Sequence, residues 1–417
     1  MFGWGKAILF LSMMIVIGCS KNIVLVETAN RRESRPSLSM EKESALDADI
    51  GEKRSDAGVG PDDTPMDIEG DPTASGEQMT NQTGSRALWD HGQFLSNFAL
   101  SPNDRYIATV GRLGNIRIWD TKEETEVASI PSPQDPAERN GDNAYTVNDL
   151  DFTRDNRLLI YGDSEGTLHA FDLERKTEIW REDRTVTGRP VDPEEGNLND
   201  ILGVACSPEE DIVVAGNEYG MITIHESGSG RRIKRYGKSQ TMDRVQDIAF
   251  SKNGRFFTVL RGGSVQIWRT RTPIPIKEYQ LLDRRRKFFP DAAAYSPDGA
   301  WIVVGGELVI LMISTNSKTR KEISYSGYVY SLGFSPDGRF LAGAGDAGCV
   351  FVYELETGLS NYFSKGDEGA ACRKVAFTSN GIGFYALKDG STSLDYFVIG
   401  ADTDGWYPAV VSPVSRK

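Results

Sequence analysis

Ser335-Pro336-Asp337-Gly338-Arg339 is one of seven copies of a short motif that recurs along the chain. The other six copies begin at Ser101, Thr153, Ser207, Ser251, Ser296 and Thr378. The spacings between successive copies are 52, 54, 44, 45, 39 and 43 residues. A period of about 40–45 residues, with short strands around each copy, indicates the blades of a β-propeller. The sequence therefore predicts an all-β fold with seven blades.

The motif has the chemistry of a tight turn. Each copy opens with a hydroxyl residue, which can bond its own backbone two residues on, and several continue with Pro, which presets φ for a type I turn. The fourth position needs a left-handed backbone if the hairpin closes with a bulge. Six copies carry a residue there that tolerates positive φ, and only Glu210 is unsuited. The residues at this position are Asp104, Asn156, Glu210, Gly254, Gly299, Gly338 and Gly381.

The flanks of the motif predict strands. The run after each copy is nearly continuous in apolar residues, as in Tyr106–Val110 and Phe340–Ala344. Such runs suit strands that are buried on both faces, which stacked blades provide. The position two residues before the motif is small in six copies, as expected where inner strands crowd around an axis. Asp151 alone breaks this column. We interpret it as a buried, hydrogen-bonded carboxylate, with a functional acid facing the channel as the alternative.

The sixth copy, which runs from Val329 to Glu354, resembles a WD repeat almost throughout. Trp119-Asp120 is a literal copy of that family's terminal dipeptide, whereas its Gly-His pair occurs only in reverse, as His91-Gly92. The family's turn aspartate before the third strand is matched by Asp163, Asp346 and Asp389. The resemblance covers roughly residues 86–411 and implies a seven-bladed β-propeller of WD-repeat type over residues 86–417.

The predicted blades begin near residues 95, 145, 198, 242, 289, 327 and 370. Closure of the ring requires an outer strand for the last blade, because an open ring leaves strand edges exposed. Arg86–Trp89 is expected to supply this strand, as the ring clasp of the family does. Trp406–Val411 competes for the same edge.

Residues 1–18 predict a secretory signal peptide. Lys6 supplies a positive charge, and Ala7–Ile17 is an apolar stretch that is too short to span a bilayer comfortably. The stretch leads into Val16-Ile17-Gly18-Cys19, which resembles the bacterial lipobox that is cleaved before its cysteine. The resemblance implies lipidation of Cys19, with chains such as palmitate. Ser20 implies the outer membrane of a bacterial cell envelope, on its periplasmic side. An uncleaved membrane anchor that runs on through Val26 is the alternative.

The segment that follows, within residues 19–85, predicts a disordered acidic tether. Residues 20–85 carry 14 Asp and Glu against 7 Lys and Arg, and no aromatic residue. Such a segment cannot bury enough apolar surface to offset its ordering entropy. The net charge of the chain is −13, and with −7 on the tether and +1 on Lys6 the remaining −7 falls on residues 86–417. This charge argues against nucleic acid as a partner.

The sequence offers little catalytic chemistry. The histidines are scattered without metal-ligand spacing, at His91, His169 and His225. The chain has no nucleophile elbow, phosphate loop or Cys-x-x-Cys motif. Beyond Cys19 it has three cysteines, an odd number that indicates free thiols: Cys206, Cys349 and Cys372. We therefore predict no catalytic residue, no metal and no cofactor.

Two classes of function stay open. The first is a membrane-tethered, non-catalytic scaffold that binds a protein partner. The second is a propeller enzyme, such as a lactonase-like hydrolase that holds a metal with Glu, Asn and Asp side chains, and a quinone-dependent dehydrogenase is a weaker third. Such enzymes need polar ligands from several inner strands. The inner positions of this chain are mostly Ala, with Asp151 as the only polar exception, so the first class is favoured.

Two connections between predicted blades are unusually long, residues 131–144 and 181–200. Both are expected on one face, over the first three blades. Insertions confined to one face of a repeat fold often mark its binding side, although drift is the alternative because extra loop length costs little. The predicted partner contacts are Arg112, Arg139, Asn140, Tyr145, Arg184, Arg189, Asn199 and Tyr219. The basic runs Arg231–Arg235 and Arg284–Lys287 are interpreted as solvated surface, or as contacts to an acidic partner or lipid headgroups.

Overall fold

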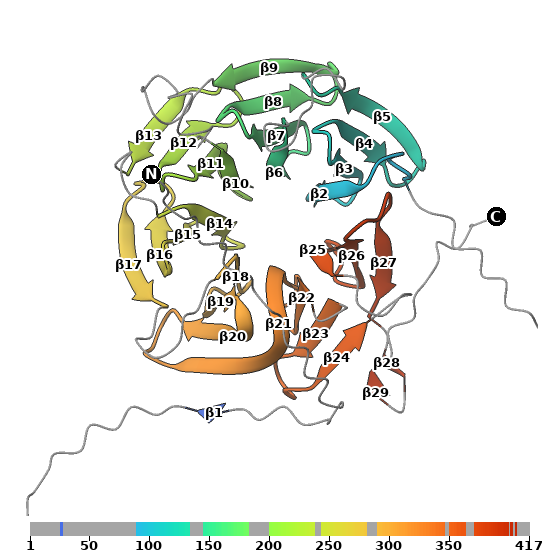
Figure 1. Cartoon of the computed structure of the whole chain (residues 1–417). Helices are drawn as coiled ribbons and strands as arrows, with labels where there is room; N and C mark the ends of the chain where they lie inside the picture. The colour runs from blue at the N-terminus through green and yellow to red at the C-terminus, as the bar shows by residue number, and fades with distance from the viewer. Residues whose placement is uncertain are drawn as a thin grey trace, which may run out of the picture. The chain divides into compact units, whose positions relative to one another are not determined.

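A computed structural model describes residues 26–27, 89–133, 145–182, 200–237, 243–281, 290–346, 350–363, 371–399, 401–402 and 405–406. These residues form an all-β structure without helices. Their strands make seven blades around a central axis (Figure 1). The predicted fold, a seven-bladed β-propeller, is therefore confirmed. Within the described ranges no helix is long and apolar enough to cross a membrane.

Blades 1 to 4 each contain four antiparallel strands, in chain order from the axis to the rim (Figure 1). Blade 1 consists of β2 (Leu95–Leu100), β3 (Tyr106–Gly111), β4 (Ile116–Asp120) and β5 (Thr125–Ile130). Blade 2 consists of β6 (Val147–Phe152), β7 (Leu158–Asp163), β8 (Leu168–Asp172) and β9 (Thr177–Glu182). Blade 3 consists of β10 (Ile201–Cys206), β11 (Ile212–Asn217), β12 (Ile222–Glu226) and β13 (Arg232–Tyr236). Blade 4 consists of β14 (Val245–Phe250), β15 (Phe256–Arg261), β16 (Ser264–Arg269) and β17 (Pro275–Gln280).

Blades 5 and 6 share one strand of 15 residues, β21 (Arg320–Phe334). Blade 5 also contains β18 (Ala292–Tyr295), β19 (Trp301–Gly305) and β20 (Glu307–Ser314). Blade 6 continues with β22 (Phe340–Gly345), β23 (Val350–Glu354) and β24 (Ser360–Phe363). Blade 7 contains β25 (Cys372–Phe377), β26 (Gly383–Lys388) and β27 (Asp395–Val398). Of the three two-residue strands, β1 (Val26–Glu27) pairs with β21, and β28 (Ala401–Asp402) pairs with β29 (Gly405–Trp406).

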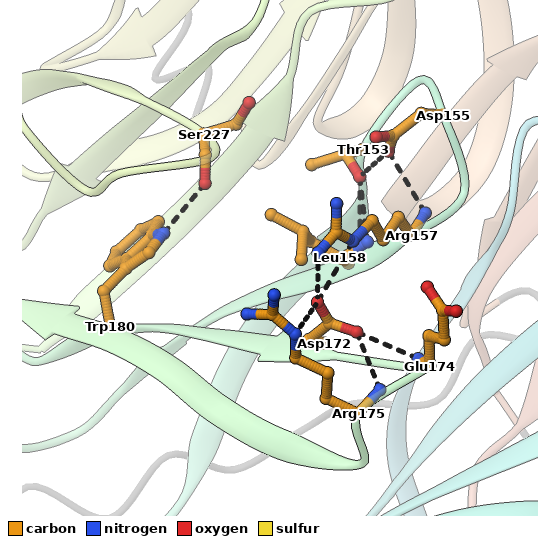
Figure 2. Close-up of polar contacts among 9 residues, drawn as sticks. All are labelled: Thr153, Asp155, Arg157, Leu158, Asp172, Glu174, Arg175, Trp180 and Ser227. Atoms are coloured by element: carbon orange, nitrogen blue, oxygen red, sulfur yellow. Dashed lines mark hydrogen bonds and ion pairs between the residues drawn. The ribbon is translucent and has the colours of Figure 1, made fainter.

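The repeated motif forms the turn between the first and second strands of each blade. Its fourth residue has positive φ in six copies, for example 60° at Asn156 and 74° at Gly338, and Glu210 is the exception. In blade 2 the hydroxyl of Thr153 donates to Asp155 Oδ1 at 2.6 Å and accepts the N–H of Leu158 at 3.0 Å (Figure 2). The predicted turn chemistry is therefore present.

The buried carboxylate of Asp172, the last residue of β8, stabilises blade 2 through hydrogen bonds. The Asp172 side chain is fully buried and accepts hydrogen bonds from Arg157 Nε at 3.0 Å and Nη2 at 2.9 Å (Figure 2). The N–H groups of Glu174 and Arg175 donate to its other oxygen at 3.0 and 2.9 Å. Burial raises the pKa of Asp172, but these hydrogen bonds outweigh it and hold the pKa below its ordinary value. The carboxylate therefore stabilises the fold at neutral pH.

Replacing this carboxylate should destabilise the propeller. We expect Asp172→Ala to lower the free energy of unfolding by about 2 kcal/mol, because charged hydrogen bonds are lost around a buried group. Denaturant unfolding measures the difference. The control is Asp211→Ala, since Asp211 also pairs with an arginine, Arg154, at 2.9 Å but its side chain is 73% exposed. Equal losses in the two variants would contradict the structural role of Asp172.

Blades 7 and 1 meet at a closed seam. Leu95 N–H donates to Ser391 O at 2.8 Å, and His91 N–H donates to Thr392 O at 2.9 Å. On the side of the repeated turns, Ser379 N–H and Oγ donate to the carboxylate of Asp104, at 2.8 and 2.6 Å. Buried side chains of both blades also form one cluster, which includes Phe98 and Leu387. The ring is therefore closed by side chains and backbone together.

The predicted clasp strand is only partly covered by the described residues. Trp89 is buried, and its ring centroid lies 5.6 Å from that of Tyr385 in blade 7, but Trp89 belongs to a turn and not to a strand. Residues 86–88 and 407–411 lie outside the described ranges. Trp406 pairs with Ala401 in the small β28–β29 sheet. Among the described residues, blade 7 thus has three strands.

Candidate functional site

The first strands of all seven blades line a central cavity of about 540 Å³. Side chains on a strand point to the same side at every second residue. The position four residues before each turn therefore points to the same side as the position two residues before it, and five of its seven residues line the cavity. This second column carries Asn97, Asp149, Gly203, Asp247, Ala292, Ser331 and Lys374. The expectation that Asp151 is the only polar side chain at the channel is therefore wrong.

Carboxylates of the channel link blade 2 to blade 3 and blade 4 to blade 5. Asp149 accepts the N–H of Val204 at 2.8 Å, and Asp151 accepts the N–H of Cys206 at 2.8 Å, so blade 2 holds blade 3 twice. Asp247 of blade 4 accepts the N–H of Ala293 in blade 5 at 2.7 Å. Asp151 is thus hydrogen-bonded, as interpreted from the sequence. These aspartates connect neighbouring inner strands and also line the cavity.

A lysine crosses the channel toward these acids. Lys374 Nζ of blade 7 lies 3.2 Å from Asp149 Oδ1 of blade 2. Burial is the largest cause that raises the pKa of Asp151 and of Asp247, the negative charge of Asp149 raises both as well, and the resulting pKa of each is about 7. The backbone N–H groups that they accept, and the charge of Lys374, lower both pKa values in part. Both carboxyl groups therefore change protonation state near neutral pH.

The raised pKa values predict how stability depends on pH. An aspartate with a folded pKa near 7 and an unfolded value near 4 binds more protons in the folded state, so its contribution is present at low pH and is lost as pH rises through 7. We expect Asp151→Asn together with Asp247→Asn to remove part of the wild-type gain in melting temperature between pH 8 and pH 5. The amide oxygens can still accept the N–H groups. Parallel wild-type and variant curves would contradict the assignment.

The histidines serve the packing of the blades. His91 Nδ1 lies 2.8 Å from Thr109 Oγ1, which accepts the indole N–H of Trp119 at 2.9 Å. His169 lies between Asp163 and Glu178, at 3.0 and 2.7 Å. His225 is fully buried with Glu182 Oε2 2.8 Å from its Nδ1. In the described part of the chain no group of three or more His, Cys, Asp or Glu is placed to hold a metal ion, and Cys206 and Cys372 are buried and are not in a disulfide.

Three of the eight predicted partner-contact residues lie within the described ranges. Arg112 is exposed in the β3–β4 turn, and Tyr219 is half-buried in the β11–β12 turn. Tyr145 is buried in the core between blades 1 and 2, against Gly114, whose φ is 79°. Tyr145 is therefore a packing residue, and its prediction as a surface contact is wrong. The remaining predicted site residues lie outside the described ranges: Cys19, Arg139, Asn140, Arg184, Arg189 and Asn199.

The ends of the two long connections lie at one end of the blades. Thr146, after the first connection, accepts the N–H of Ser164 in the β7–β8 turn at 2.9 Å. Asp200, the last residue of the second, accepts the N–H of Glu218 in the β11–β12 turn at 3.1 Å. Residues 181–182, counted within the second connection, are instead the end of β9. We call this end of the propeller, which carries the turns between second and third strands, the loop face.

The basic run Arg231–Arg235 lies mostly in the outer strand of blade 3. Its described side chains are exposed, and two of them pair with acids, Arg231 with Glu226 and Arg232 with Glu182. Exposed basic side chains that pair with acids of the same chain favour the interpretation of this run as solvated surface. Residues 284–287, the other basic run, lie outside the described ranges.

Comparison with known proteins supports the resemblance of this chain to WD-repeat proteins. Residues 85–120 and 318–354 match the family model for the WD domain, G-beta repeat. The chain is 26% identical to a serine-threonine kinase receptor-associated protein of Dictyostelium discoideum over 243 residues, which are 57% of this chain and 72% of that protein. It is 24% identical to eukaryotic translation initiation factor 3 subunit I of Drosophila willistoni over 277 residues, 62% of this chain and 80% of that protein. It is 22% identical to transcription factor unc-37 of Caenorhabditis elegans over 206 residues, but these are only 29% of that protein.

Proposed function

We propose that this chain is a non-catalytic protein-interaction scaffold, in which a WD-repeat propeller binds a protein partner on its loop face. The observation that carries the proposal is the repeat itself: seven blades, with matches to the WD-repeat family model at residues 85–120 and 318–354, and propellers of this type typically hold other proteins. The names of two relatives also refer to association, one with a serine-threonine kinase receptor and one as a subunit of a translation initiation factor.

The construction of the propeller suits a binding role. Hydrogen bonds between side chains and the backbone of the next blade stiffen the ring: Asp149 accepts the N–H of Val204, and Asp247 accepts the N–H of Ala293. Long loops on such a rigid scaffold are where binding residues concentrate. The strands before both connections, β5 and β9, end beside the starts of β4 and β8 at the loop face, and the residues at the ends of the connections bond to turns of the same face. We therefore assign the partner to this face.

The proposal includes a lipid anchor. Residues 1–18 would be the signal peptide, Cys19 the lipidated residue, residues 20–85 the tether and residues 86–417 the propeller. Each buried CH₂ of an acyl chain contributes about 0.8 kcal/mol, and more than one chain makes anchoring stable. In the structure Val26 and Glu27 of this segment pair with β21 rather than lying in a coil. A free coil of 66 residues would span about 45 Å. The propeller would then work close to a membrane of the bacterial envelope, with the outer membrane favoured.

The scaffold proposal is tested against the enzyme alternative by elemental analysis. A lactonase-like hydrolase would hold a divalent metal at the mouth of its channel. We expect full-length protein, purified without chelators and extensively dialysed, to contain far less than one metal ion per chain. A stoichiometric metal that Asp149→Asn or Asp247→Asn removes would contradict the non-catalytic assignment.

A further inference from the structure

A continuous row of arginine and aromatic side chains borders the channel on the loop face at the seam of the ring. The Arg112 guanidinium lies 5.7 Å from the ring centroid of Phe94, and its Nη2 donates to Asp389 Oδ1 at 2.8 Å. Arg373 Nη2 donates to the other oxygen of Asp389 at 3.0 Å. The Arg373 guanidinium lies 4.6 Å from the ring centroid of Tyr330. We call these five residues the seam row, which joins blades 1, 7 and 6.

The seam row is open to solvent. Phe94 is 52% exposed, and the side chains of Arg112 and Arg373 are 55% and 41% exposed. Leu113, next to Arg112 in the same turn, is 36% exposed. Tyr330 and Arg373 also line the central cavity, so the row continues into the channel. Aromatic residues and arginine are enriched at binding interfaces relative to the rest of a protein surface. The composition of the seam row is therefore that of a binding interface.

The charge of the row is unbalanced. Two guanidinium groups share the single carboxylate of Asp389, which is itself 32% exposed. One positive charge is therefore left over among the three groups. Nearby, Lys374 is already paired with Asp149 inside the channel. A carboxylate from outside could accept hydrogen bonds from either arginine, and planar guanidinium groups bind carboxylates with two parallel hydrogen bonds.

We propose that the seam row is the docking site for an acidic segment of the protein partner. This inference rests on the proposed function and adds the chemistry of the partner. The segment carries Asp or Glu, whose carboxylate takes the place of Asp389 at Arg112 and Arg373. An aromatic or aliphatic side chain beside it packs on Phe94 and Leu113. The site therefore lies over blades 6, 7 and 1, and Arg112 is the residue that it shares with the contacts predicted from the sequence.

The test uses the full chain and a phage-displayed library of random dodecapeptides. We expect the selected peptides to combine Asp or Glu with a neighbouring aromatic or aliphatic residue. Fluorescein-labelled copies of these peptides then give affinities by anisotropy. Arg112→Gln and Arg373→Gln should each weaken binding about tenfold, because each removes a charge-assisted hydrogen bond. Higher salt should weaken binding in the same direction.

A third variant separates binding from structure. Asp389→Asn removes the carboxylate that competes with the peptide, so we expect tighter binding, by about threefold or more. A merely structural role of Asp389 at the seam predicts the opposite, weaker binding. Arg271→Gln is the control, because Arg271 is 83% exposed and pairs with Glu210 at the opposite end of the blades, so peptide affinity should not change. Melting temperatures should stay close to wild type, since exposed ion pairs contribute little to stability.

Three outcomes would overturn the seam row as this site: no enriched peptide, enriched peptides without acidic residues, or acidic peptides that bind Arg112→Gln and Arg373→Gln as tightly as wild type. The scaffold proposal is judged separately, by capture of the native partner. If the partner is still captured while the peptide test fails, only the seam row is wrong. If capture fails as well, the scaffold itself is wrong.

Discussion

A variant with both long connections shortened should lose its protein partner and keep its fold. We expect this when residues 134–144 and residues 183–199 are each replaced by a five-residue Gly-Ser loop. The replacement keeps Tyr145, which is buried, and Glu182, which binds His225 and Arg232. It removes much of the loop surface that we assign to the partner. Shorter loops cost less closure entropy, by about 0.6 kcal/mol for each halving, so the melting temperature should be nearly unchanged.

The measurement is affinity capture of the partner from detergent-solubilised membranes, with wild type and variant side by side. The control variant replaces residues 282–289, the connection between blades 4 and 5, with a five-residue loop. This connection contains the basic run 284–287. Undiminished capture by the first variant together with loss in the second would move the contact surface to the basic run. Loss in the first alone supports the assignment.

The second large effect is expected on the attachment of the protein to the membrane. Cys19→Ser should shift nearly all of the protein from the membrane fraction to the soluble fraction, because the variant cannot receive the acyl chains that supply the affinity. The melting temperature of the propeller should not change, since residue 19 precedes the blades. Cys372→Ser is the control: Cys372 is a buried cysteine of β25, so its loss should leave the protein on the membrane.

Mass spectrometry of the mature protein checks the same claim directly. Lipidation predicts a chain that begins at Cys19 and carries added acyl mass. An intact segment of residues 1–18 on the mature protein would contradict it, and would favour the uncleaved anchor that extends through Val26.

The turns of the propeller could be read from the sequence because their chemistry is local. Whether residue four of the motif adopts positive φ depends on its own side chain, so Gly338 and Asn156 were predictable, and Glu210 was correctly identified as unsuited. The hydrogen bonds of Asp151 were also predictable, since a lone carboxylate in a small-residue column needs donors.

The channel and the seam row depend on contacts between residues far apart in the chain. Asp149 and Lys374 are 225 residues apart, and Arg112 and Asp389 are 277 residues apart, so no local pattern pairs them. The two-residue period of the inner strands is nevertheless a local signal, and it identifies Asp149, Asp247 and Lys374, four residues before their turns, as channel residues. Tyr145 was misplaced because a residue at the end of a long connection can belong to the core.

Crosslinking of the native complex tests the central claim most directly. A lysine-reactive crosslinker is applied to the protein with its partner on isolated membranes, and the linked peptides are identified by mass spectrometry. Lys388, at the end of β26 beside the seam row, reports on the loop face. Lys122, Lys176 and Lys252 lie in exposed turns at the opposite end of blades 1, 2 and 4. The account predicts links from the partner to Lys388 and none to the three control lysines. Links concentrated on Lys122, Lys176 and Lys252 would contradict it.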